Sequence, residues 1–258
     1  LWEVSRQALV GRRCRALARA QALLLRAPGR AKDLASALLV EAPDLGEARV
    51  VRGRASLRVG DSATALSDLS PLLSGDSAGV ADPAALWDGG RAALAQKDAP
   101  SAARFFRALG SRAALLPDRS QQVTAYIEIA GALLAYDSAP VDDVLAYLRE
   151  ARRRSSGSGL SGLCAALTAV AWLGEGRQSE AQGALGDLAD AEGLSRFAGN
   201  KAVWLPDGLL DAALAVALER KQPELSAQHY QALSQSPLGK GKLGKLAMRS
   251  ASAKRGAR

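Results

Sequence analysis

The sequence predicts an all-α protein: an α-solenoid of about five to six stacked antiparallel helix hairpins, followed by a disordered basic C-terminal tail. Apolar residues make up 48% of the chain and are mostly Ala and Leu, whereas aromatic residues reach only 4%. This mixture favours close helix packing, because Ala has the highest helix propensity and a small side chain. Period-two alternation and β-branched runs are almost absent, so strands have little support.

A repeated spacing of small residues predicts the hairpins. A small residue is followed twelve positions later by Ala, or by Asp in one imperfect copy. The copies recur at intervals of roughly 40 residues, the length of a two-helix repeat. They are Gly53 with Ala65, Gly90 with Ala102, Gly131 with Asp143, and Ala169 with Ala181.

The first hairpin is expected before residue 46. Its second helix carries Ala31, Ala35 and Leu38 on one face, and Pro43 closes it. Its first helix has an apolar stripe beside a basic stripe whose members fall within about a 60° arc at helical spacing. The basic stripe consists of Arg12, Arg15, Arg19 and Arg26. Such a stripe could lie on an anionic membrane or a nucleic-acid backbone, or it could be the solvated face of a terminal helix.

The clearest hairpin spans residues 46–73. Its first helix should end at Val59, because Gly60 can adopt a left-handed conformation and Asp61 can cap the next helix. Gly53 should let the second helix approach closely, with Leu69 packing back onto it. The next hairpin repeats this order with Gly90, Asp98, Ala102 and Phe106.

These two units resemble the tetratricopeptide repeat (TPR) over residues 46–110. In that family a small residue, a Gly-Asp type of turn, an Ala and a bulky residue follow one another in fixed order. The family's early Trp and Tyr are missing here, where Arg49 and Ser56 stand in the clearest unit. The matching residues are Gly53, Gly60, Asp61, Ala65 and Leu69, then Gly90, Asp98, Ala102 and Phe106, with Pro43 ending the preceding unit.

Later units follow the pattern less closely. A third uses Gly131, with Val144 and Leu148 on its second helix, and the segment SSGSGLSG at 155–162 predicts a turn or a break between two parts. A fourth unit and a last pair over 206–234 complete a repeat domain of residues 1–236. Residues 237–258 are expected to form a disordered basic tail, because they hold few apolar residues. The markers of the last two units are Ala169, Trp172, Ala181, Leu185 and Leu188, then Leu214, Ser226 and Tyr230.

Residues for chemistry are scarce in this chain. His229 is the only histidine, and Cys14 and Cys164 are not at metal-ligand spacing. We therefore expect no metal, no cofactor and no catalytic residue, and an interaction protein rather than an enzyme. No apolar stretch is long enough to span a bilayer without charges.

The TPR resemblance implies a concave groove lined by the first helix of each hairpin. In the first two matching units it places Arg54, Arg58 and Arg91 beside Trp87, an arrangement that could pair carboxylates and hold an apolar side chain. The alternative is that Trp87 fills a gap between repeats and the arginines are solvated. The third unit adds Glu128 and Tyr136 to the expected groove. The complete set of groove positions that the resemblance implies is Glu47, Val50, Arg54, Leu57 and Arg58 in the first matching unit, and Ala84, Trp87, Arg91, Leu94 and Ala95 in the second.

The sequence therefore predicts a protein–protein interaction scaffold or adaptor that binds a partner segment, with acidic groups, inside a larger bacterial assembly. The competing hypothesis is a polyanion-associated protein. The net charge is +8, and Lys and Arg are in excess at both ends of the chain, around an acidic middle. The chain opens on Leu1 and its single Met is Met248, so we expect a removed leader or upstream domain, or a fragment. The compartment stays open between the cytoplasm and the bacterial cell envelope.

Overall fold

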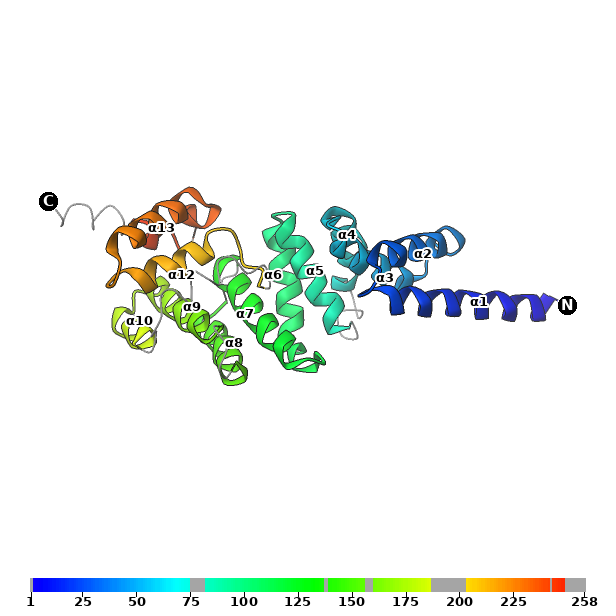
Figure 1. The fold of residues 1–258 in the computed structure, drawn as a ribbon, viewed down its shortest axis with the longest axis horizontal. Coiled ribbons are helices and arrows are strands. Elements are labelled where there is room, and N and C mark those ends of the chain that lie inside the picture. The colour runs from blue at the N-terminus through cyan, green and yellow to red at the C-terminus, as the bar shows by residue number, and fades with distance from the viewer. Residues whose placement is uncertain are drawn as a thin grey trace. The chain divides into compact units, whose positions relative to one another are not determined.

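A computed structural model describes residues 2–74, 82–136, 139–155, 160–186, 203–241 and 243–248, except the side chains of 2–9 and 247. Every regular element in these ranges is a helix, which confirms the all-α prediction (Figure 1). The chain divides into two compact units, Leu1–Ala108 and Leu109–Arg258. Among the described helices, none is long and apolar enough to cross a membrane.

Successive helices of the first unit pack against one another. α1 packs on α2, α2 on α3, α3 on α4, and α4 on α5. In addition, α1 touches α3 and α3 touches α5, so alternate helices also meet. The elements are α1 (Trp2–Leu23), α2 (Pro28–Glu41), α3 (Gly46–Arg58), α4 (Ser62–Leu69), the 3-10 turn η1 (Ser70–Leu73), α5 (Pro83–Ala95) and α6 (Ala99–Gly110), within which the unit boundary falls.

The turn between α3 and α4 has the predicted geometry. Gly60 has a φ of 88°, and the Asp61 side chain accepts a hydrogen bond of 3.1 Å from the Thr64 amide. The Asp61 amide also donates back to the Ser56 carbonyl at 2.9 Å, which satisfies a carbonyl at the end of α3.

The same turn occurs twice more. Lys97 and Gly176 have φ angles of 58° and 78°. In each turn the amide of the next residue donates a hydrogen bond to the carbonyl five residues earlier. The Asp98 amide donates to the Ala93 carbonyl, and the Arg177 amide donates to the Trp172 carbonyl, both at 2.9 Å. The turns of three predicted repeats therefore have the same backbone conformation and the same hydrogen bond.

The small residues have the predicted purpose in the first two matching units. A Cβ on Gly53 would lie 2.9 Å from the Asp68 Cβ and from the Leu69 Cγ. A Cβ on Gly90 would lie 2.8 Å from the Phe106 Cζ. Ala65, Leu69, Ala102 and Phe106 are fully buried. Glycine thus lets the paired helix approach more closely than any side chain would allow.

The second unit also packs helix by helix: α7 on α8, α8 on α9, α9 on α10 and on α12, and α12 on α13. In the predicted last pair, the Ser226 hydroxyl donates to the Ala215 carbonyl at 2.6 Å, and Tyr230 is only 2% exposed. The elements are η3 (Ala113–Leu115), α7 (Arg119–Tyr136), α8 (Val141–Arg154), α9 (Leu160–Gly174), α10 (Gln178–Leu185), α12 (Leu209–Leu218), α13 (Pro223–Gln235), η4 (Pro237–Lys240) and α14 (Gly244–Ala247).

The third predicted small-residue pair is wrong. A Cβ on Gly131 would meet not α8 but the chain just before and at the start of α12, 2.8 Å from the Leu205 Cδ2 and 3.1 Å from the Leu209 Cδ2. Asp143, its predicted partner, is exposed in the first turn of α8. The segment leading into α12 therefore lies on α7, although α8, α9 and α10 come between them in the chain. This is a departure from strict nearest-neighbour stacking.

The prediction of disorder from residue 237 is also wrong for the part that the structure describes. Leu238, Leu243 and Leu246 are 4%, 1% and 2% exposed, and α14 packs against α13 and α9. Three leucines suffice here because they add to an existing core instead of building one. Residues 242 and 249–258 of the predicted tail lie outside the described residues. So do residues 156–159 within the predicted break near 155–162, and Leu188 of the fourth predicted unit.

Candidate functional site

An open groove of about 520 Å³ lies in the first unit. It is lined by residues of α1, α3 and η1, by Leu24 just after α1, and by the start of α5. Its volume falls within the range of about 300–1,000 Å³ that is typical of ligand-binding pockets. The apolar lining residues are Leu24, Val50, Val51, Leu72 and Ala85, and the polar ones are Gln21, Glu47, Arg54 and Asp82.

The floor of this groove belongs to the core of the unit. Leu24 and Val51 are 7% and 3% exposed, and both belong to the cluster of buried side chains that joins α1, α2 and α3. Because these side chains are fixed by packing on their inner side, the groove is a preformed feature of the helix stack.

Three of the residues predicted from the TPR register line this groove: Glu47, Val50 and Arg54. Arg58, Trp87 and Arg91 are not among its lining residues. The register residues of α3 and the lining of this groove therefore overlap, whereas the register residues Trp87 and Arg91 of α5 lie outside it.

Asp88 explains why Arg54 and Arg58 do not project into the groove as open cations. The Arg54 Nε donates to the Asp88 Oδ2 at 2.9 Å, and the Arg58 Nη1 donates to the same oxygen at 3.0 Å. The Arg54 Nη1 donates to the Asp82 Oδ2 at 2.9 Å. Asp88 is only 5% exposed, so this network joins α3 to α5 and compensates a nearly buried carboxylate.

Trp87 and Arg91 form a pair of their own. The Arg91 guanidinium carbon lies 4.1 Å from the Trp87 ring centroid, the geometry of a cation–π contact. Trp87 is 8% exposed. Its ring therefore fills space between helices, and little of its surface is left for a partner.

The two predicted residues of α7 lie in the second unit and have different environments. Glu128 is fully buried and accepts a hydrogen bond of 2.8 Å from the Trp204 amide. The prediction that it lines an open groove is wrong, because the chain before α12 covers α7 at this point. Tyr136 is half-buried, and burial, together with the negative charge of Asp207, raises the pKa of its hydroxyl.

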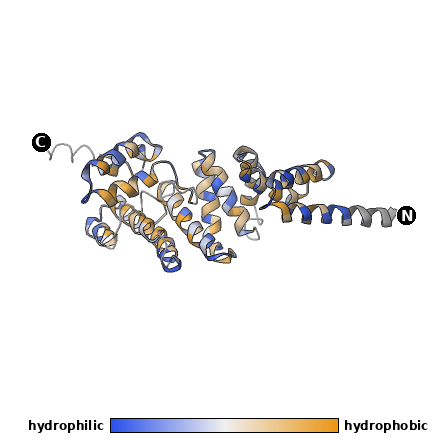
Figure 2. Cartoon of the chain, viewed as in Figure 1, coloured by the Kyte–Doolittle hydropathy of each residue, from blue (hydrophilic) through white to orange (hydrophobic). Residues whose placement is uncertain are grey.

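The basic stripe lies on the solvent side of α1. Arg12, Arg15 and Arg19 are exposed, and at about 100° per residue they lie opposite Gln21, the residue of α1 that lines the groove. Figure 2 shows hydrophilic residues along α1 beside the hydrophobic ones. Arg26, assigned to the stripe from the sequence, falls outside the helix because α1 ends at Leu23.

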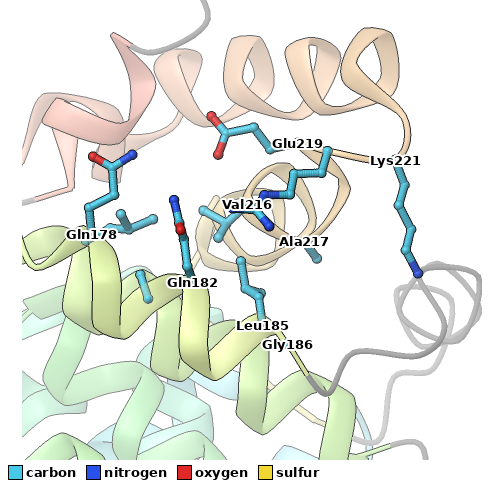
Figure 3. Close-up of a pocket in the computed structure, with 11 residues that line it drawn as sticks. Gln178, Gln182, Leu185, Gly186, Val216, Ala217, Glu219 and Lys221 are labelled. Atoms are coloured by element: carbon cyan, nitrogen blue, oxygen red, sulfur yellow. The ribbon is translucent and has the colours of Figure 1, made fainter.

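A second pocket, of about 390 Å³, lies in the second unit between α10 and α12. Figure 3 shows Gln178 and Gln182 on α10 directed toward α12, while Lys221 extends away from them. Amides, apolar side chains and a few charges line this pocket. No nucleophile with an adjacent base is among its described residues.

The described histidine, serine and cysteine side chains that could act in catalysis do not form a nucleophile–base pair. The His229 Nδ1 lies 2.9 Å from the Asp211 Oδ1. Ser226, one helical turn before His229, donates its hydroxyl hydrogen to the Ala215 carbonyl. Burial raises the pKa of the Cys164 thiol to about 12, which keeps it protonated and unreactive. Within the described ranges no cluster of His, Cys, Asp and Glu could hold a metal ion.

The signal that the sequence carries for Asp88 is its position, an acidic residue within an apolar helix pattern. Arg54 and Asp88 are 34 positions apart, as are Ser62 and Gln96, whose side chains meet at 2.6 Å. Equivalent positions of these two units are 37 residues apart, as for Gly53 and Gly90, so Asp88 and Gln96 each lie three residues, about one helical turn, before the position equivalent to their partner.

No protein-family model matches this chain, and no curated protein matches it.

Proposed function

We propose that this chain is a TPR-like α-solenoid that acts as a protein–protein interaction scaffold, an adaptor within a larger bacterial assembly. Its hairpins are antiparallel pairs, and its first helices present the surface that a partner segment contacts. The groove along α1, α3 and α5 is the observation that carries this proposal. Three successive first helices line it, as the inner face of a curved helix stack requires.

The repeated turns support the same proposal. The turns after α3, α5 and α9 share their backbone hydrogen bonds and a left-handed residue, and a small residue precedes each left-handed position by seven residues: Gly53, Gly90 and Ala169. A stack built from equivalent units fixes many side chains along one surface, and this suits the binding of a segment rather than catalysis.

The test compares two Val→Asp variants. Val50→Asp puts a carboxylate into the groove, whereas Val40→Asp changes a residue on α2 that is 84% exposed and does not line the groove. Affinity purification with the wild-type chain, followed by mass spectrometry, should recover a partner that Val40→Asp retains and Val50→Asp loses. Circular dichroism establishes that both variants keep their helix content.

If every recovered protein binds Val50→Asp as well as the wild-type chain, this groove is not the partner site and the proposal fails.

The exposed basic stripe favours a second function, association with a polyanion. Arg15 and Arg19 make no ion pair within the described residues, and the Arg12–Glu41 pair is a loose one of 3.7 Å with Arg12 66% exposed. On this hypothesis the Arg15→Gln/Arg19→Gln double variant should weaken binding to a short DNA duplex. It should also lower the salt dependence by about 0.9 in slope for each phosphate that the variant no longer neutralises. The groove hypothesis predicts no effect on partner binding.

A further inference from the structure

We infer that the groove of the first unit takes a partner segment in which an apolar side chain stands beside a Lys or Arg. This inference rests on the proposed function, because it names the chemistry of the segment that the scaffold binds. It reverses the expectation from the sequence, in which groove arginines would meet an acidic segment.

Arg54, the only cation among the described residues that line the groove, is already satisfied. It donates from Nε to Asp88 and from Nη1 to Asp82, both at 2.9 Å, and its side chain is only 18% exposed. A partner carboxylate would therefore have to compete with two intramolecular ones. A nearly buried Asp88 makes that exchange costly, because it would lose compensation for its charge.

The carboxylates of the groove are more accessible than its cation. Glu47 is exposed and makes no ion pair among the described residues, and the Asp82 side chain is 52% exposed. Glu47 lies in the first turn of α3, and Asp82 caps the start of α5. A cation entering near these residues would gain the carboxylate of Glu47, and it would share the exposed carboxylate of Asp82 with Arg54.

The aliphatic side chains that line the groove favour an apolar side chain in the partner segment. Leu24, Val50 and Leu72 contribute aliphatic side chains to the groove, and an apolar partner side chain there would remove this surface from water. The groove lining carries two carboxylates, Glu47 and Asp82, against the one guanidinium of Arg54, so it is locally acidic. The arginine stripe of α1 lies on the opposite side of that helix.

The experiment measures binding of three fluorescein-labelled peptides by anisotropy. The peptides share one Leu and Val pattern, and their flanking positions are all Lys, all Gln or all Glu. We expect the Lys peptide to bind the wild-type chain about three- to tenfold more tightly than the Glu peptide, as two partly exposed charge pairs would give. This preference should shrink as salt is raised.

Two variants attribute the preference to the groove. Glu47→Lys should remove or reverse it, and Glu47→Gln should reduce it with little disturbance of α3. The matched control is Asp33→Lys, because Asp33 is an exposed acidic residue of α2 outside the groove. It should leave the preference as in the wild-type chain.

The outcomes separate this inference from the proposed function. If all three peptides bind equally, or the Glu peptide binds best, and Val50→Asp abolishes that binding, the inference fails while the groove stands as a docking site. If no peptide binds, or Val50→Asp leaves binding unchanged, both fail. Sedimentation showing a dimer that Val50→Asp dissociates would also overturn the inference, because a second copy would then be the occupant of the groove.

Discussion

Single residues at the α3–α5 contact show how a charged side chain can be misjudged from sequence alone. The TPR resemblance placed Arg54 among the groove residues, and Arg54 does line the groove of the first unit, but the register contained no information on Asp88 as its partner. Asp88 stands in an apolar helix and is 5% exposed, a position where an acidic residue is rare unless it is paired. An unexplained acidic residue within an apolar helix pattern was the available signal.

Asp88→Ala should lower the free energy of unfolding by about 2–3 kcal/mol, because it leaves two arginines without their shared, nearly buried acceptor. Both arginines keep some contact with water, with side chains 18% and 26% exposed, which limits the loss. Urea denaturation measures the change. Asp44→Ala, at an exposed position, is the control and should change stability little.

Asp61 provides a test by pH. Its hydrogen bonds, first from the Lys32 ammonium and then from Thr64, lower the pKa of the Asp61 carboxyl to about 2. Because the folded-state pKa lies below the unfolded value, the stability that this carboxylate adds is present above about pH 4 and is lost as pH falls toward 2. An NMR titration of the side-chain carbon should show this midpoint.

Lys32→Ala should raise that midpoint, while the cap to Thr64 persists. An Asp61 titration near pH 4 in the wild-type chain would contradict the 2.6 Å contact between Lys32 and Asp61.

At the scale of the helix, most of the fold could be predicted from the sequence. Turn residues and small contact residues are local signals, so the end of α3, the cap at Asp61 and the approach at Gly53 and Gly90 are confirmed. The contact of Gly131 was not predictable in this way. Its neighbours Leu205 and Leu209 come from far along the chain, and a repeat pattern describes only adjacent units.

Gly90→Ala should destabilise the protein by about 1–3 kcal/mol, because the new methyl group would overlap the Phe106 ring in a close-packed site. The expected consequence is a lower midpoint of thermal unfolding. Gly46→Ala is the matched control, since a Cβ at Gly46 meets nothing within 4 Å. Equal midpoints for both variants would show that α5 and α6 do not meet at Gly90.

At the scale of the whole molecule, the number of apolar residues predicted the wrong boundary for the C-terminal tail. Residues 237–248 hold few apolar side chains, but Leu238, Leu243 and Leu246 are buried against helices that are already folded. Composition indicates whether a segment can form a core on its own. It does not indicate whether the segment can pack against a folded surface beside it.

Two truncations test this boundary. Removal of residues 249–258 should leave the free energy of unfolding nearly unchanged. Removal of 237–258 should lower it by at least about 3 kcal/mol, because three buried leucines would be removed and the surface beneath them exposed. Equal stability of the two truncated chains would contradict the packing of α14.

The hydrogen bond from the Trp204 amide to Glu128 spans 76 positions of the chain, and it affects how the second unit comes apart. A purely linear array can unravel stepwise from either end, since each repeat depends only on its neighbours. Here this hydrogen bond joins α7 to the segment just before α12. The two ends of the stretch from α7 to α12 are therefore in contact with each other, as well as each helix with its neighbour. Hydrogen exchange of α7, α9 and α12 should therefore proceed through a single shared opening, as in one cooperative block.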